Sequence, residues 1–161
     1  MGRLEGKVAL VTAAGGAIAG ATARLFGLEG AAVACVDIVE ENVTKTATDI
    51  EAAGGKAIPI VCDVTDDAAV KEAIDKTVST FDKLNVCFNA AAYSEKRHRL
   101  AEMPLEMWKS VIDVNLTGMF IVARHVIPQM QEAGGGSIIN VSSIYGVVGA
   151  KERPAYCAAK G

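Results

Sequence analysis

Three residues in the last part of the chain have types and spacing that suit proton transfer at an oxygen atom. Tyr156 and Lys160 lie four residues apart, so their side chains share one face of a helix, and Ser143 comes 13 residues before the tyrosine. A free tyrosine has a pKa of about 10, too high for base work at neutral pH, and a nearby ammonium group lowers such a value. A serine hydroxyl can hold the reacting oxygen. This set suits hydride transfer at a carbinol carbon, in which a proton also moves at the oxygen.

A second candidate site lies near the amino end, in a turn of small residues. The turn covers residues 12–20, where small side chains let the backbone approach a pyrophosphate at the start of a helix. Asp37 ends the next apolar run. A carboxylate at this point accepts hydrogen bonds from the ribose hydroxyls of an adenosine and repels a 2′-phosphate. The pattern indicates a dinucleotide site that favours NAD over NADP.

Regularly alternating elements position both candidate sites. Strands are expected at residues 7–12, 31–37, 57–61, 84–89 and 137–142, and helices at 17–29, 40–53, 66–81, 105–132 and from about 154. The strands lack polar alternation, as in sheets that are buried on both faces. The order predicts one α/β domain over residues 1–161, a doubly wound, Rossmann-like parallel sheet with five strands. In such sheets, ligands bind outside the carboxyl ends of the strands.

Composition argues against several classes of partner. The formal net charge is −3, whereas nucleic-acid and anionic-membrane partners favour basic surfaces. No apolar run reaches about 18 residues and no signal peptide is recognisable, so we expect no membrane span and a cytoplasmic protein. Neither the two histidines nor the cysteines have metal-ligand or disulfide spacing, so no metal is expected. The cysteines, expected to be buried and inert, are Cys35, Cys62, Cys87 and Cys157.

The longest irregular segment, residues 91–103, carries the charged cluster EKRHR at residues 95–99. Two interpretations remain open for this cluster. It is either a solvated loop or a part of the rim of a substrate site.

The motifs around Tyr156 resemble those of the short-chain dehydrogenase/reductase family. Residues 156–160 read YCAAK, which matches the family's YxxxK core, and Ser143 matches its upstream serine. Asn115 matches the fourth catalytic member, which in the family kinks the long helix and holds a proton-relaying water. The resemblance implies Asn115, Ser143, Tyr156 and Lys160 as the catalytic set, with the tyrosine as general acid and base. It also implies NAD as the cofactor and a small alcohol or ketone as the substrate.

The first turn resembles the family's TGxxxGxG fingerprint, but alanine replaces all three glycines, at Ala13, Ala17 and Ala19. If position 13 or 17 needs a positive φ, alanine costs on the order of 1 kcal/mol there. Residues 89–92 resemble the NNAG motif, with alanine at positions 90 and 92, and residues 63–64 resemble the pair that contacts adenine. The cofactor contacts that the resemblance implies are Ala13, Gly16, Ala17, Ile18, Asp37, Ile38, Asp63, Val64, Asn89, Ala90, Ala91, Tyr156 and Lys160.

Family chains usually run to roughly 250 residues as one domain, so the resemblance implies further strands and a substrate-covering segment after residue 161. Without them, strand 137–142 would be an edge strand that exposes Ile138, Ile139 and Val141. The resemblance also implies a homo-dimer or homo-tetramer, with helix 105–132 in the interface. The substrate and the direction of reaction cannot be read from these residues.

Two functions from different classes remain open. One is an NAD-dependent alcohol dehydrogenase or carbonyl reductase. The other is a non-catalytic relative or fragment that folds and binds a nucleotide or a partner without turnover. The alanines at positions 13, 17, 90 and 92 favour the second function, and the intact set Asn115, Ser143, Tyr156 and Lys160 favours the first.

Overall fold

Five parallel strands form the central sheet of the computed structural model, which describes residues 2–161. The strands are β1 (Val8–Thr12), β2 (Ala32–Asp37), β3 (Lys56–Val61), β4 (Val86–Asn89) and β5 (Ser137–Asn140). Their spatial order is β3-β2-β1-β4-β5, so the order reverses between β1 and β4. This arrangement confirms the predicted doubly wound, Rossmann-like sheet and puts a ligand crevice at the carboxyl ends of β1 and β4.

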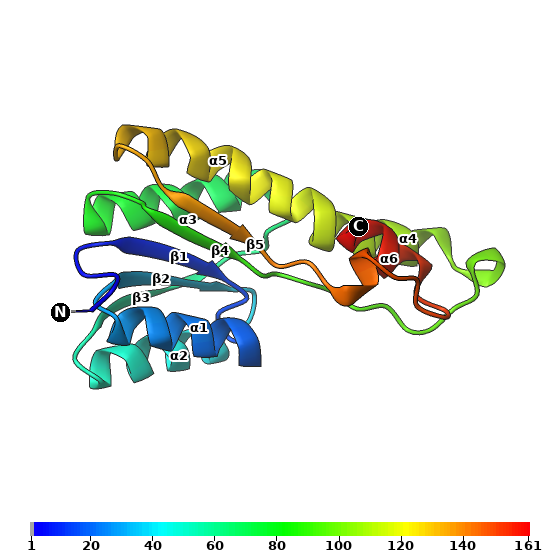
Figure 1. Cartoon of the computed structure of the whole chain (residues 1–161), viewed down its shortest axis with the longest axis horizontal. Coiled ribbons are helices and arrows are strands. Elements are labelled where there is room, and N and C mark those ends of the chain that lie inside the picture. The colour runs from blue at the N-terminus through cyan, green and yellow to red at the C-terminus, as the bar shows by residue number, and fades with distance from the viewer. Residues whose placement is uncertain (1) are drawn as a thin grey trace.

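Helices cover both faces of the sheet (Figure 1). The helices are α1 (Ala17–Leu28), α2 (Glu40–Ala52), α3 (Asp67–Phe81), α4 (Leu105–Ile112), α5 (Gly118–Glu132) and α6 (Pro154–Lys160). Val8 and Leu10 pack in one apolar cluster with α3 and α5, while Ala9 and Val11 pack in a second cluster with α1 and α2. Strands β1, β2 and β4 therefore bury both of their faces, which explains why their sequences show no polar alternation.

The predicted long helix is continuous but changes its winding near its middle. A π-helical turn, Asp113–Thr117, joins α4 to α5. The whole stretch Leu105–Glu132 is long and apolar enough to cross a membrane, which weakens the composition-based expectation of no span. However, core helices of soluble proteins pass the same test, and α5 packs on the sheet and on α3. Arg124 and His125 of α5 both contact the Asp67 carboxylate at the start of α3, at 2.8 Å.

A lobe formed by α4, α6 and the 3₁₀ turn Ile144–Gly146 extends beyond the carboxyl ends of the strands (Figure 1). A separate apolar cluster holds this lobe together, in which Val111 of α4 packs with Ala155 and Ala159 of α6. Trp108 and Tyr156 pack against these residues. The lobe therefore places the residues of the YxxxK motif next to the carboxyl ends of the strands.

Strand β5 forms one edge of the sheet, as predicted for residues 137–142, but it is shorter. Ile139 is 42% exposed. Ile138 packs against the core, and Val141 is only partly exposed and donates its N–H to the Asn89 carbonyl at 3.0 Å. The expected exposure is therefore confirmed for Ile139, whereas Ile138 and Val141 are only partly exposed.

Three cysteine side chains lie buried, as expected, on β2, after β3 and on β4. Burial raises the pKa of Cys35 and Cys87 to about 12, and burial next to Asp63 raises the pKa of Cys62 to about 11. The expectation of burial is wrong for Cys157, which lies on the short helix α6 and is partly exposed.

These thiols are expected to make the fold lose stability in alkali. Above pH 9.0, the ordinary thiol pKa, the unfolded chain releases protons that the folded chain keeps. The free energy of unfolding should therefore fall as pH rises from 9 towards 11, by up to about 1.4 kcal/mol per pH unit for each thiol. Urea titrations at pH 8, 9 and 10 measure the slope. Cys87→Ala should make the dependence of the free energy of unfolding on pH shallower. Cys157→Ala, a control at a partly exposed position, should leave this dependence unchanged. Equal slopes in the parent and both variants would contradict the role of the buried thiols.

Candidate active site

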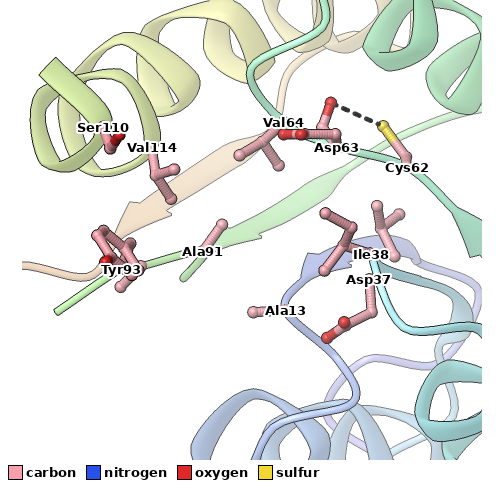
Figure 2. Close-up of a pocket in the computed structure, with 12 residues that line it drawn as sticks. Ala13, Asp37, Ile38, Cys62, Asp63, Val64, Ala91, Tyr93, Ser110 and Val114 are labelled. Atoms are coloured by element: carbon pink, nitrogen blue, oxygen red, sulfur yellow. Dashed lines mark hydrogen bonds between the residues drawn. The ribbon is translucent and has the colours of Figure 1, made fainter. Parts of the chain in front are cut away.

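A cavity of about 540 Å³ opens at the carboxyl ends of β1, β2, β3 and β4 (Figure 2). Six of the predicted cofactor residues line it: Ala13, Asp37, Ile38, Asp63, Val64 and Ala91. The other lining residues are not among the predicted cofactor contacts; they are Val36, Cys62, Ala92, Tyr93, Ser110 and Val114. Apolar side chains make up most of the wall, and carboxylates lie on the β2 and β3 side. The cavity thus unites loops that follow four different strands.

Asp37, at the end of β2, is held at the cavity by the backbone. Its Oδ2 accepts a hydrogen bond from the Gly15 N–H, and its Oδ1 accepts one from the Val39 N–H, both at 2.9 Å. Each carboxylate oxygen has two lone pairs, so both can accept one more hydrogen bond from a ligand. The carboxylate is therefore fixed in place and still able to bind hydroxyl groups.

The start of α1 supplies the backbone side of this site. Gly16 is the N-cap residue, and Gly16, Ala17 and Ile18 are exposed and lie outside the cavity lining. The first N–H groups of any helix lack acceptors inside the helix and attract anions. Ala17 and Ile18 can therefore contribute backbone N–H groups next to the cavity, but not cavity walls. The Gly16 N–H is not free, because it donates to the Ala13 carbonyl at 2.9 Å.

Tyr156 and Lys160 lie together on α6, as their spacing predicts. The Lys160 Nζ is 5.9 Å from the centre of the Tyr156 ring, and it donates a hydrogen bond to the Val141 carbonyl at 2.7 Å. Burial lowers the pKa of Lys160, which is 7% exposed. The ring of Tyr145 packs edge-on against that of Tyr156, with 6.4 Å between the ring centres. The partly buried phenol thus has an ammonium group near its ring and a second aromatic ring packed against it.

The two serines that follow β5 have different contacts. The Ser143 hydroxyl accepts a hydrogen bond from the Tyr145 N–H at 3.2 Å, which places it at the start of the turn that carries Tyr145. The Ser142 hydroxyl donates to the Lys160 carbonyl at 2.7 Å. Ser142 therefore ties the strand end to α6, whereas Ser143 lies beside the turn that packs on Tyr156.

Asn115 lies in the π-helical turn and is fully buried. Its Nδ2 donates to the Tyr93 carbonyl at 2.7 Å and to the Val111 carbonyl at 2.8 Å. Its Oδ1 has no hydrogen-bond partner within residues 2–161. The side chain thus connects the altered helix turn to the loop that follows β4.

Comparison with known proteins decides the family. A family model described as short chain dehydrogenase matches residues 7–161. The chain belongs to this family. Over 158 residues, it is 40% identical to the 3-oxoacyl-acyl-carrier-protein reductase of Thermotoga maritima, with 98% of this chain and 64% of that protein covered. It is 37% identical over 158 residues to the cyclohexanol dehydrogenase of an Acinetobacter species, with 98% and 63% covered.

Solved structures show the same fold. The crystal structure of NAD⁺-bound xylitol dehydrogenase matches with a TM-score of 0.95 and 38% identity, over 99% of this chain and 61% of that chain. The chain therefore spans a little over three fifths of the length of the relatives it matches.

The short-chain dehydrogenase fingerprint is altered here, and the structure shows where this matters. Ala13 has a φ of 55°, in the left-handed region, whereas Ala17 begins α1 without a positive φ. The cost of about 1 kcal/mol that is expected for an alanine with a positive φ therefore applies at position 13 and not at position 17. Close packing of α1 depends on Gly20, because a Cβ there would lie 2.8 Å from the Ala14 carbonyl oxygen.

Replacing Ala13 with glycine is expected to stabilise the fold by about 0.5–1 kcal/mol, because glycine adopts a positive φ without steric cost. The matched control is Ala17→Gly, which should lower stability slightly because position 17 is helical. Urea unfolding of the two variants and the parent measures both effects. A lower stability for Ala13→Gly would show that the turn does not need this conformation.

The altered NNAG motif is braced by a residue that the sequence did not single out. The Thr12 hydroxyl accepts hydrogen bonds from the N–H groups of Ala90, at 2.8 Å, and Ala91, at 3.1 Å. It donates to Asn89 Oδ1 at 3.3 Å. Asn89 itself is fully buried, and its Nδ2 donates to the Met119 carbonyl at 3.0 Å. Asn89, predicted as a cofactor contact, is thus not part of the cavity lining and instead connects β4 to α5 and to β1, whereas Ala91 lines the cavity.

Gly15 is a second residue that sequence reasoning missed. A Cβ at this position would lie 2.6 Å from the Asn42 Cβ and 3.0 Å from Asp37 Oδ2. Its lack of a side chain therefore allows the close contact that holds Asp37. A glycine two residues after the first fingerprint position is the only sequence signal of this role.

Proposed function

We propose that this protein is an NAD-dependent oxidoreductase that transfers a hydride between NAD(H) and a secondary alcohol or ketone. The observation that carries the proposal is the position of the buried Lys160 ammonium, 5.9 Å from the centre of the Tyr156 ring. The cavity at the strand ends and the names of the relatives, which are dehydrogenases and reductases, support it.

The cavity residues fit a dinucleotide. Asp37 would accept hydrogen bonds from the two ribose hydroxyls of the adenosine, while Asp63 and Val64 would flank the adenine. The N–H groups at the start of α1 would bind the pyrophosphate, and Ala90 and Ala91 would lie along the cofactor. When bound, the nicotinamide supplies the hydride acceptor or donor. The Asp37 carboxylate would repel a 2′-phosphate, which is the basis for proposing NAD rather than NADP.

Tyr156 would carry the proton to or from the substrate oxygen. The Lys160 ammonium would stabilise the phenolate form by its positive charge, and it would reach the nicotinamide ribose. The Ser143 hydroxyl would hold the substrate oxygen and stabilise negative charge on it. Asn115 would hold the proton-relaying water that leads to Lys160. Its Oδ1 has no hydrogen-bond partner among the residues that the structure describes, so it could accept a hydrogen bond from this water.

The wider context of the enzyme is also proposed. Leu116, Phe120 and Ile127 are exposed apolar residues at helical spacing on the long helix, and they support a homo-dimer or homo-tetramer. The buried, unpaired thiols support a reducing compartment such as the cytoplasm. The proposed partners are small alcohols and ketones, with neither nucleic acid nor a membrane.

A two-step experiment separates the enzyme from a non-catalytic relative. NADH is first titrated into the full chain and its fluorescence is followed. Turnover of a panel of secondary alcohols with NAD⁺ is then measured. The proposal predicts saturable binding and NADH production. Binding without any turnover would instead favour the non-catalytic alternative.

A further inference from the structure

Glu95 is buried in a segment that is otherwise exposed. Its exposed fraction is 2%, whereas the neighbouring Lys96 and Arg97 are exposed. The sequence left the charged cluster open as a solvated loop or a substrate rim, and neither interpretation describes Glu95. A buried carboxylate loses its hydration and persists only where the fold holds it in place.

The Glu95 carboxylate binds the helix that carries the YxxxK motif. Its Oε1 accepts a hydrogen bond from the Tyr156 N–H at 3.1 Å. Its Oε2 is buried without a hydrogen-bond partner in the part of the chain that the structure describes. Tyr156 is the third residue of α6, so its N–H is one of those that have no acceptor inside the helix.

Helix α6 depends on such a contact more than most helices do. It has seven residues, and helices that short are marginal on their own. The residue before it, Arg153, provides no side-chain cap within the described residues, and Pro154 has no N–H to offer. The cap therefore comes from Glu95, which lies far away in the sequence. Losing a cap of this kind destabilises ordinary helices.

The same segment is also attached to Asn115. The Tyr93 carbonyl accepts the Asn115 Nδ2 hydrogen bond at 2.7 Å, two residues before Glu95. The Ser94 hydroxyl contacts the Arg153 guanidinium, and the His98 N–H donates to the Glu152 carbonyl at 3.1 Å. A continuous set of contacts thus runs from the π-helical turn through residues 93–98 to the first turn of α6.

We infer that Glu95 is a positioning residue for the proposed catalytic tyrosine. It fixes the first turn of α6 and, through residues 93–95, holds Tyr156 in a set place relative to Asn115. The inference rests on the proposed function, because it assigns the cap a role in turnover as well as in folding. Catalysis depends steeply on geometry, and a misplacement of about 1 Å can cost roughly 100-fold in rate.

Four variants of the full chain test the inference. In Glu95→Ala the cap is lost, and in Glu95→Asp the oxygen is withdrawn by one methylene, whereas Glu95→Gln keeps an acceptor at the same reach. Glu102→Ala is the control, since Glu102 is an exposed glutamate in the 3₁₀ turn Leu100–Glu102 of the same loop. The measurements are kcat, the KM for the alcohol, the NADH Kd and the exchange rate of the Tyr156 amide hydrogen.

The expected result is a fall in kcat of roughly tenfold or more for Glu95→Ala and Glu95→Asp, with the NADH Kd within about twofold of the parent. Glu95→Gln should restore most of kcat, and Glu102→Ala should match the parent. Amide exchange at Tyr156 should be faster in the alanine and aspartate variants only.

Two outcomes would overturn the inference. Glu95→Ala or Glu95→Asp with parental kcat and only a lower Tm would show a purely structural cap. Glu95→Gln as damaged as Glu95→Ala would show that the charge matters and the cap does not. If Glu95→Ala fails to fold, the kcat values of Glu95→Asp and Glu95→Gln still test the inference, because it predicts a low value for the first and a nearly parental value for the second. A parent without turnover would contradict the proposed function, and the amide exchange would still test the cap.

Discussion

Replacing Tyr156 with phenylalanine is expected to lower kcat by roughly 10²–10⁴-fold, the usual contribution of a general acid or base. The change removes only the hydroxyl. The ring can still pack edge-on against Tyr145 and beside the Lys160 ammonium, so the fold and the cofactor cavity should remain. NADH binding should therefore be nearly unchanged. Steady-state kinetics with NAD⁺ and a secondary alcohol, together with a fluorescence titration of NADH, measure the two effects separately.

The matched control for this variant is Tyr145→Phe. Tyr145 lies on the same turn as Ser143, and its ring faces Tyr156, but it is not in the proposed catalytic set. Its kcat should stay much closer to that of the parent. A Tyr156→Phe enzyme that keeps more than about a tenth of the parental activity, a loss below about 1.4 kcal/mol in the barrier, would show that the tyrosine does not carry the proton.

Replacing Asp37 with serine is expected to weaken NAD binding by roughly 10–100-fold, because hydrogen bonds to a charged group contribute about 1.5–3 kcal/mol. Binding of NADP should be unchanged or tighter, because the repulsion of the 2′-phosphate is removed. The ratio of the two affinities, which favours NAD in the parent, should therefore fall, because NAD binds more weakly and NADP binds as well or better. Fluorescence titrations of NADH and NADPH with the parent and the variant give all four dissociation constants.

Asp37→Ser also changes the net charge of the protein by one unit, so a control must separate this effect from the loss of the carboxylate at the cavity. Glu40→Gln removes one negative charge from the exposed start of α2, close in sequence to Asp37 but outside the cavity lining. It should leave the preference between the cofactors unchanged. Equal or tighter binding of NADPH than of NADH by the parent protein would contradict the role of Asp37.

The sheet and the approximate positions of both sites could be predicted because they depend on patterns of many residues. Apolar runs that alternate with helical periods predict a parallel sheet, and its topology brings Asp37, Asp63 and Ala91 to one cavity. The four-residue spacing of Tyr156 and Lys160 likewise predicts a shared helix face, which the structure shows.

Features that depend on one contact between distant residues could not be predicted. Nothing in a charged loop indicates that Glu95 reaches the Tyr156 N–H, and nothing in β1 indicates that Thr12 braces Ala90 and Ala91. The sign of φ at Ala13 could not be predicted either, because alanine at a position that is usually glycine is compatible with either sign.

The most direct test of the central claim is to follow the hydrogen itself. The full chain is incubated with NAD⁺ and secondary alcohols that carry deuterium on the carbinol carbon, and the NADH that forms is analysed by mass spectrometry. Direct hydride transfer at this site predicts that the parent forms NADH carrying one deuterium and that Tyr156→Phe reduces its formation to near background. Unlabelled NADH, or no NADH from any alcohol while NADH itself binds, would contradict direct hydride transfer at this site.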